Sequence, residues 1–367
     1  MNLLEIKNLK MDFGKNADAL RAIDDVSLTI GAGETVCLVG ESGCGKTVTA
    51  LSIAKLVPTP PANYIGGEIL LNGSDVLKMS SRELQKIRGG VVSYVFQEPG
   101  ASLNPVFRIG NQIKESLKLH RPLTPSLSPS DGERVSEGRV RGSYDAEVIR
   151  LLKLVGIPAP ESRIRNYPFE MSGGMQQRVM IAMALASEPK LLVADEPTTA
   201  LDVTIQAQIL DLLRDLKQRL GMAILLITHN LGIVGDMADR VAVMYAGQIV
   251  ELAPARELLQ KPFHPYTKAL MNSVPKLGGW GEATDEPKLK NGSAQAPARG
   301  DARPTRLQSI PGNVPRIGNF PPGCRFAPRC PIAKPECSEK IPELLEVEPG
   351  RFVRCPFWKE NNSLAVH

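Results

Sequence analysis

A glycine-rich stretch that ends in a lysine and a threonine carries the strongest chemical signal in this sequence. Residues 40–47 read GESGCGKT and fit the pattern G-x-x-x-x-G-K-[ST], between the apolar run 36–39 and a helical segment. Glycines allow several backbone N–H groups to point at one phosphate, Lys46 reaches the terminal phosphates, and Thr47 offers a hydroxyl to Mg²⁺. The expected members of this site are Gly40, Ser42, Gly43, Cys44, Gly45, Lys46, Thr47 and Val48.

Two carboxylates stand at the end of a second apolar run, residues 191–194. Asp195 can hold the coordination shell of Mg²⁺, and Glu196 can orient or deprotonate an attacking water, a role worth roughly 10²–10⁴-fold in rate. Considered alone, two acids at a strand end are better explained as solvated surface groups. The phosphate-binding loop elsewhere in the chain favours the catalytic interpretation.

A third stretch, residues 172–174 with the sequence SGG, opens an apolar helical run. It predicts a helix N-terminus whose small residues permit close approach of an anion. Without further context, a serine N-cap followed by two glycines is the better interpretation.

The elements that position these residues are predicted from hydrophobic periodicity. Apolar and polar residues alternate through the first thirty positions, which predicts strands with one face toward a core. Four short apolar runs are each followed by polar residues, as in buried parallel strands whose carboxyl ends carry function. These runs are residues 36–39, 91–96, 191–194 and 223–227. Hairpins are predicted at Asn72-Gly73 and Ala246-Gly247. The chain is therefore expected to be an α/β protein with a mainly parallel core sheet and some antiparallel structure.

Two helices with apolar stripes are predicted, and two segments interrupt the pattern. The helices are expected around residues 148–155 and 205–216. Residues 122–142 are rich in Pro, Ser, Gly and charge without an apolar period, so we expect an exposed loop or disordered insertion. Residues 278–306 are poor in large apolar side chains and are expected to link the body to a Pro- and Cys-rich tail.

Composition limits the classes of protein that remain. The 367 residues include 43% hydrophobic and 23% charged side chains, which is typical of a globular protein with one large domain and an appendage, or with two domains. A net charge of +5 gives no strong case for a nucleic-acid partner. No run of 18 apolar residues occurs, and the start of the sequence lacks the pattern of a secretory signal. We therefore expect a cytoplasmic protein.

Together these motifs resemble those of ATP-binding-cassette (ABC) ATPases. The matching features, in the order of that family, are the loop 40–47, Ser172-Gly173-Gly174, Asp195-Glu196, Ala200-Leu201-Asp202 and His229. The resemblance covers about residues 1–270. It implies a P-loop nucleotide-binding domain over residues 1–262, with a mainly parallel core sheet, an antiparallel β subdomain and a helical subdomain at about 98–190. The insertion 122–142 departs from the family pattern and lies in the arm that touches the membrane subunit.

Longer stretches resemble the ATPase subunits of oligopeptide and dipeptide importers. They are residues 171–178, 195–206, 264–267 and the tail that starts at Ile310. The resemblance implies that residues 263–367 form the C-terminal extension of that family and that ATP hydrolysis by this chain energises import of dipeptides or oligopeptides. Import of nickel or another small solute is the alternative within transport, because substrate choice lies in other subunits. Action on nucleic acid or ribosomes is the alternative outside transport, and a single cassette without a strong basic stretch argues against it.

The resemblance also implies roles for individual residues. Glu196 would be the catalytic base, His229 would contact the γ-phosphate, and Gln97 would sense the metal and the membrane subunit. The Mg²⁺ ligands would be Thr47, Gln97 and Asp195. Phe13 is the candidate for stacking on adenine.

Other implied roles involve partners. Ser172, Gly173 and Gly174 would complete the nucleotide site of another ATPase across a head-to-tail dimer, with Asp202 also beside the nucleotide. The implied partners are a second ABC ATPase subunit, identical or not, two membrane permeases and, indirectly, an extracytoplasmic solute-binding protein. The chain would lie peripherally on the cytoplasmic face of the inner or plasma membrane.

Four cysteines cluster near the C-terminus: Cys324, Cys330, Cys337 and Cys355, with the spacing C-x5-C-x6-C-x17-C. This spacing matches neither short-spaced zinc sites nor ferredoxin runs. In a reducing compartment, four nearby thiolates favour zinc or an iron–sulfur cluster, with Arg325, Arg329 and Arg354 offsetting their charge. Free cysteines in a loop are the alternative. Resemblance to the importer tails favours a [4Fe-4S] cluster.

Overall fold

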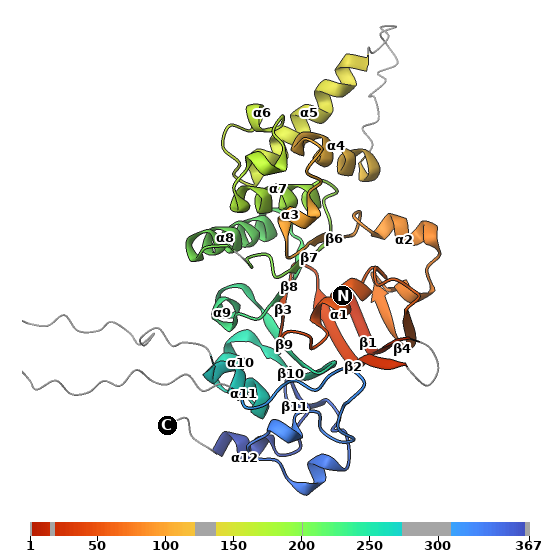
Figure 1. Cartoon of the computed structure of the whole chain (residues 1–367), viewed down its shortest axis with the longest axis vertical. Helices are drawn as coiled ribbons and strands as arrows, with labels where there is room; N and C mark the ends of the chain where they lie inside the picture. Colours follow the sequence, from red (N-terminus) through yellow and green to blue (C-terminus); the bar gives the residue numbers. More distant parts are fainter. Residues whose placement is uncertain (1, 15–18, 122–136, 200, 274–309, 364–367) are drawn as a thin grey trace, which may run out of the picture.

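The computed structural model describes residues 2–14, 19–121, 137–199, 201–273 and 310–363. Figure 1 shows a central sheet with a helical region at one end, an antiparallel sheet on one side and the C-terminal segment at the other end. No helix within the described ranges is long and apolar enough to cross a membrane.

In the described part of the chain, the large sheet has eight strands in the order β11-β12-β10-β9-β3-β8-β7-β6. They are β3 (Thr35–Val39), β6 (Val92–Val95), β7 (Leu191–Asp195), β8 (Ala223–Thr228), β9 (Arg240–Tyr245), β10 (Gln248–Pro254), β11 (Leu345–Glu348) and β12 (Arg351–Val353). Pairing from β9 through to β6 is parallel, which confirms the predicted core sheet. β3, β7 and β8 are buried along their whole length, and their apolar runs reflect burial on both faces.

A second sheet, of order β2-β1-β4-β5, is antiparallel. Its strands are β1 (Asn2–Phe13), β2 (Leu20–Gly31), β4 (Ala62–Leu71) and β5 (Ser74–Asp75). Both predicted hairpins are confirmed, because Asn72-Gly73 joins β4 to β5 and Ala246-Gly247 joins β9 to β10. A hydrophobic cluster that includes Leu4, Ile6 and Leu9 of β1 fills the space between the two sheets.

The helical region contains α3 (Pro99–Ser102), α4 (Ile109–His120), α5 (Glu137–Leu154), α6 (Pro160–Arg163), the 3-10 turn η3 (Pro168–Glu170) and α7 (Gly173–Leu185). These helices lie beyond the β6 and β7 side of the large sheet (Figure 1). The predicted stripe of Val148, Leu151, Leu152 and Val155 is buried in the core that they share with the sheet.

The predicted loop at 122–142 is wrong over its last residues. Residues 137–142 belong to α5, and residues 122–136 lie outside the described part of the chain. Periodicity reveals only helix turns that bury an apolar stripe, so its absence did not exclude a longer N-terminal end for the helix predicted around 148–155.

The remaining helices flank the sheets. They are α1 (Lys46–Ser52), α2 (Ser81–Ile87), α8 (Val203–Leu220), α9 (Val234–Met237), α10 (Ala255–Gln260), α11 (Pro265–Asn272) and the 3-10 turns η2 (Val76–Lys78) and η4 (Leu231–Ile233). The predicted stripe of α8 is confirmed, since Ile209, Leu212, Leu213 and Leu216 are buried. Asp202 caps this helix and Gly221, with a φ of 65°, ends it.

The C-terminal extension joins the main sheet. After the turns η5 (Ala327–Arg329) and η6 (Pro335–Ser338) come β11, β12 and α12 (Trp358–Ser363). β12 pairs with β10 through Glu251 opposite Val353 and Leu252 opposite Phe352. The sheet therefore continues across the domain boundary that we expected near residue 262. The expected linker 278–306 lies outside the described residues.

Candidate active site

The phosphate-binding loop connects β3 to α1 and is shaped by two glycines with positive φ. Gly40 has a φ of 155°, and a Cβ there would lie 2.2 Å from the backbone oxygen of Met244. Gly45 has a φ of 106°, and a Cβ there would lie 2.9 Å from Met244 Cε. Glycine is therefore required at both ends of the loop, which turns tightly into α1 as the motif predicts.

Lys46 lies inside this loop. It is buried, and its ammonium donates hydrogen bonds to the backbone oxygens of Gly40 and Glu41 at 2.8 and 3.0 Å. Both partners are neutral carbonyls, so the buried positive charge is not neutralised by them. An anion bound at the loop would supply the missing compensation.

Asp195 ends β7 beside the loop. It is 8% exposed, and the Thr47 hydroxyl hydrogen-bonds it. Burial raises the pKa of Asp195, and the neighbouring Glu196 carboxylate raises it further, while the Thr47 bond and the Lys46 charge act in the opposite direction. A divalent cation between Thr47 and Asp195 would favour the ionised carboxylate, so these two side chains fit a Mg²⁺ site by position and chemistry.

Glu196 is the meeting point of a polar cluster. Its Oε1 lies 3.1 Å from His229 Nδ1. Its Oε2 accepts hydrogen bonds from Gln97 Nε2 at 3.1 Å and from the Thr199 hydroxyl at 2.9 Å. The Glu196 backbone has a φ of 48°, a left-handed conformation that costs of order 1–3 kcal/mol and that clusters at functional sites. The carboxylate is therefore held in one orientation by three side chains.

Sheet topology explains why these residues meet. The phosphate-binding loop follows β3, His229 follows β8, Glu196 follows β7, and Gln97 follows β6. These four strands are neighbours and parallel, so their carboxyl ends lie along one edge of the sheet. A ligand at that edge faces all four loops, as is general for open α/β sheets.

A pocket of about 620 Å³ opens at this edge. Nine predicted site residues line it: Ser42, Gly43, Gly45, Lys46, Thr47, Val48, Gln97, Glu196 and His229. Three further residues that sequence reasoning missed also line it: Ala22, Thr199 and Ile317. Thr199 could have been found from its place three residues after Glu196, whereas Ala22 and Ile317 gave no sequence signal. Three other predicted residues do not line the pocket but lie next to it. Gly40 and Cys44 belong to the phosphate-binding loop, and Asp195 is hydrogen-bonded by Thr47, which does line the pocket.

Several predicted residues lie outside this pocket. Phe13, expected to stack on adenine, is partly buried against the core between the sheets and is not among the lining residues. Ser172 caps α7 by accepting from the Met175 N–H at 3.4 Å, and Ser172 and Gly173 are exposed. Asp202 is likewise exposed and accepts from the Ile205 N–H at 2.9 Å. Phe13, Ser172, Gly173 and Asp202 therefore do not line the nucleotide pocket of their own chain.

Comparison with known proteins decides the family. A family model described as ABC transporter matches residues 23–199, and one described as the oligopeptide/dipeptide transporter C-terminal region matches residues 250–301 and 293–337. The chain is 44% identical to the oligopeptide transport ATP-binding protein AppD of Bacillus subtilis, over 98% of both chains. The chain belongs to the ABC transporter ATP-binding family. It is accordingly an ABC ATPase, as its motifs implied.

Further relatives agree with this assignment. A Sinorhizobium fredii protein named "Probable peptide ABC transporter ATP-binding protein" is 45% identical over 98% of this ABC ATPase and 95% of the relative. Among solved structures, the dimeric ATP-binding cassette MJ0796 in a post-hydrolysis state with ADP and Pi has a TM-score of 0.56 at 26% identity. That match covers 69% of this chain and 99% of the cassette, so the cassette fold predicted from sequence is confirmed.

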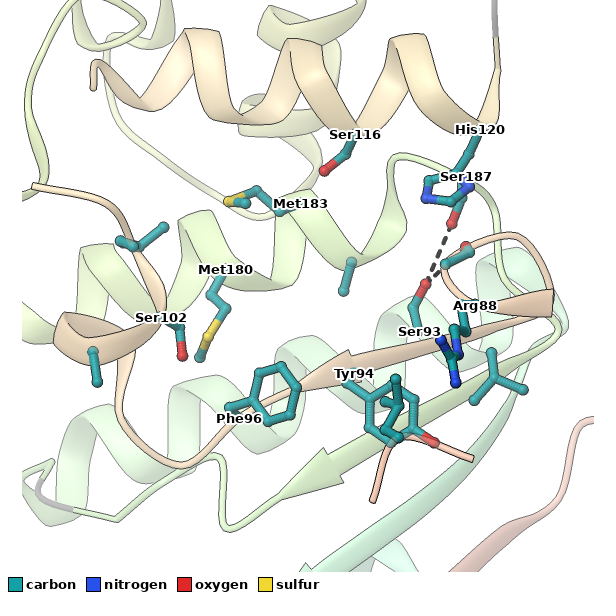
Figure 2. A pocket seen from close by; sticks show the side chains of 16 residues that line it. Arg88, Ser93, Tyr94, Phe96, Ser102, Ser116, His120, Met180, Met183 and Ser187 are labelled. Carbon is teal, nitrogen blue, oxygen red and sulfur yellow. Dashed lines mark hydrogen bonds between the residues drawn. The ribbon is translucent and has the colours of Figure 1, made fainter. Parts of the chain in front are cut away.

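A second pocket, of about 520 Å³, separates the helical region of the ABC ATPase from its sheet. Figure 2 shows Ser116 and His120 of α4 on one side, Met180 and Met183 of α7 on another, and Tyr94 and Phe96 at the end of β6. The hydroxyl oxygens of Ser93 and Ser187 are hydrogen-bonded to each other at 3.3 Å at the edge of this pocket. Phe96 immediately precedes Gln97, so this pocket and the polar cluster at Glu196 share one short loop.

The four tail cysteines line one small cavity, of about 20 Å³. Burial raises the pKa of Cys324. It also raises the pKa of Cys330 to about 11 and the pKa of Cys355 to about 12, and the neighbouring thiols add to each of these increases. Their convergence fits the predicted ligand set in chemistry. In geometry, no group of three or more Cys, His, Asp or Glu side chains among the described residues is arranged to hold a metal ion.

Three arginines beside these cysteines bind the extension to the cassette. Arg325 lies 2.5 Å from Asp24, Arg329 lies 2.9 Å from Glu41, and Arg354 lies 3.0 Å from Asp25. Each guanidinium side chain is at most 5% exposed. Burial lowers the pKa of Arg325 to about 10.

Of the three arginines only Arg354 lines the cysteine cavity, where its charge acts against the burial that raises the pKa of Cys324. All three, Arg354 included, pair with carboxylates of the cassette. The sequence showed that Arg and Cys were adjacent, but it gave no indication of the distant acidic partners.

Proposed function

We propose that this ABC ATPase energises the import of dipeptides or oligopeptides. The named relatives are peptide-transport ATP-binding proteins that match almost the whole chain, and the C-terminal region typical of oligopeptide/dipeptide transporters supports the same substrate class. The observation that carries ATP hydrolysis is the single pocket in which the Glu196 cluster faces the phosphate-binding loop.

The proposed roles follow from this geometry. Lys46 and the backbone of the loop bind the terminal phosphates. Glu196 takes a proton from a water whose oxygen bonds to the γ-phosphorus while the bond from that phosphorus to the β–γ bridging oxygen breaks, releasing ADP and phosphate. His229, beside Glu196, contacts the γ-phosphate. Thr47, Asp195 and Gln97 would hold Mg²⁺, which would supply positive charge to neutralise the phosphate oxygens.

Dimerisation would complete the site. Ser172, Gly173 and Asp202 are exposed and lie outside the pocket of their own chain, as expected of residues that act on a partner's nucleotide. The solved cassette that this chain resembles is dimeric. We infer a head-to-tail dimer with a second ABC ATPase subunit.

The permease would dock over the pocket of Figure 2. Phe96, which lines this pocket, is 42% exposed, and the helical region and the loop before it carry further exposed large apolar side chains: Val106 at 71%, Phe107 at 54%, Leu119 at 70% and Phe169 at 72%. Such exposure is typical of an interaction surface, and methionines at its wall adapt to a partner's shape. A permease segment here would touch the loop of Gln97, and the chain would sit peripherally on the cytoplasmic face of the membrane.

The complex can be isolated to test this function. A tagged native chain, purified from membranes in mild detergent, is expected to bring down two permeases and a second cassette subunit, identified by mass spectrometry. Met183→Glu is expected to lose the permeases while it still binds ATP, because a charge enters the docking pocket. Leu345→Glu, at an exposed site in the extension, is the matched control and should keep them.

Other results would contradict the proposal. Ribosomal or nucleic-acid partners without a permease would overturn the transport role. Peptide-stimulated ATPase activity of the isolated complex supports peptide import, whereas stimulation by nickel alone would favour the alternative substrate.

We also propose that Cys324, Cys330, Cys337 and Cys355 hold a [4Fe-4S] cluster, with zinc as the alternative. The support is chemical, because thiolates are the ligands that both centres prefer and all four thiols line one cavity, while these four side chains are not arranged around a metal ion. Protein purified without oxygen is expected to contain iron and sulfide, measured by elemental analysis and visible absorbance. Cys330→Ser should lose most of the metal, whereas Cys37→Ser, in β3, should retain it. Equal metal content in both variants, or none in the native protein, would refute the site.

A further inference from the structure

The nucleotide pocket includes a side chain from the C-terminal extension. Eleven of its lining residues lie between Ala22 and His229, and the remaining one is Ile317. Ile317 is 39% exposed, so it has apolar surface available for contact. Apart from glycines, the pocket's apolar lining consists of Ala22, Val48 and Ile317.

Ile317 is anchored onto β2 from its C-terminal side. Gly318 has a φ of 89°, and a Cβ there would lie 2.4 Å from Leu20 Cδ2, so the segment presses directly on β2. Arg325 lies over the Phe320 ring, with 3.9 Å between its Cζ and the ring centroid. The same guanidinium pairs with Asp24 of β2 at 2.5 Å and donates to the backbone oxygen of Ala246. The strand that carries Ala22 therefore also holds the segment that carries Ile317.

A second anchor acts from the N-terminal side. Arg329 donates to both carboxylate oxygens of Glu41 in the phosphate-binding loop, at 2.9 and 3.1 Å. It also donates to the backbone oxygens of Pro311 and Ile310, at 2.8 and 3.4 Å. One guanidinium therefore holds residues 310–311 beside the phosphate-binding loop. The chain that follows them reaches the nucleotide pocket again at Ile317.

We propose that the C-terminal extension completes the nucleotide site, with Ile317 packing against the base of the bound nucleotide. This rests on the proposed binding of ATP in the pocket. Phosphates are bound at the polar end, by Lys46 and the loop, and Ile317 has no polar group to offer them. A flat base gains from apolar contact, and Phe13, the sequence candidate for that contact, does not line the pocket. Because the isoleucine side chain has no hydrogen-bonding group, its packing contribution is expected to be equal for adenine and guanine.

The test separates base contact from phosphate contact in the full chain. Ile317→Ala is expected to weaken ATP and GTP binding about three- to tenfold, as loss of a partly exposed apolar contact implies. Binding of inorganic tripolyphosphate should stay unchanged. Ile317→Leu should restore nucleotide binding, and Leu345→Ala, exposed elsewhere in the extension, is the matched control.

Each contrary result has a distinct meaning. Unchanged ATP affinity in Ile317→Ala, or an equal loss for tripolyphosphate, would overturn the role of Ile317. Failure of the native chain to bind ATP at all would instead overturn the proposed nucleotide site.

Discussion

Replacing Glu196 with glutamine is expected to leave ATP binding intact and to slow hydrolysis at least tenfold, and by as much as the ~10²–10⁴-fold that a positioned general base supplies. The amide has nearly the same shape and keeps an oxygen that can accept from Gln97 or Thr199, the present partners of Glu196 Oε2. It cannot take a proton from water. The change therefore removes one chemical step and spares the pocket.

The measurement needs two readouts on the same protein. Nucleotide affinity is measured by titration with a fluorescent ATP analogue, and hydrolysis by phosphate release, with the partner subunits present. Glu68→Gln, an exposed carboxylate on β4, is the control for loss of a negative charge and should match the native rate. An unchanged rate in Glu196→Gln would remove Glu196 from the role of base.

The arrangement of the site was predictable where chemistry and strand pattern coincide. The apolar runs before Gly40 and Asp195 are strands buried on both faces, and such strands in α/β folds present ligand sites at their carboxyl ends. The carboxyl ends of these strands and of the run 223–227 were therefore expected to carry function, and Glu196 Oε1 and His229 Nδ1, which follow two of them, lie 3.1 Å apart. Because neighbouring parallel strands end at the same edge of the sheet, the loops that follow them lie side by side, and no further information from the sequence is needed to predict this.

Features that depend on long-range pairing were not predictable. The three residues of β12, Arg351–Val353, are too few to show an alternating strand pattern. They nevertheless extend the main sheet, because β10 has a free edge with which they pair. Ile317 sits in a Pro- and Gly-rich tail without periodicity, and it is held at the nucleotide pocket by two long-range ion pairs, Arg325 with Asp24 and Arg329 with Glu41. Phe13 illustrates the converse, since an aromatic side chain in an alternating strand is more often part of a core.

The extension and the cassette are consequently one structural unit. Three ion pairs with buried guanidinium groups join residues 310–363 to the phosphate-binding loop and β2, and two added strands join the extension to the main sheet. The Arg329 guanidinium donates to both oxygens of Glu41, so this interface constrains the loop that carries Glu41. The extension thereby helps to set the geometry on which Lys46 depends.

Lys46→Ala is expected to abolish measurable nucleotide binding, a loss of at least about a hundredfold. A charge-assisted hydrogen bond contributes about 1.5–3 kcal/mol, so the loss of two bonds to phosphate costs at least about 3 kcal/mol. Since each ~1.4 kcal/mol corresponds to a tenfold change in affinity, this is a loss of at least about a hundredfold. The buried position of the ammonium strengthens the effect, because its present partners, the Gly40 and Glu41 carbonyls, do not neutralise its charge. A phosphate is the partner that does.

The same bonds require a second variant, because alanine also removes contacts that shape the loop. Lys46→Gln keeps an N–H donor for the Gly40 carbonyl and deletes the charge, so it should lose binding nearly as fully if the charge is what matters. Lys86→Ala, at an exposed position of α2, is the matched control and should bind ATP normally. Affinity is measured by the same fluorescence titration, with circular dichroism to compare folding. Tight ATP binding in Lys46→Gln would show that the loop backbone alone holds the phosphates, and Lys46 would then be a structural residue of the loop.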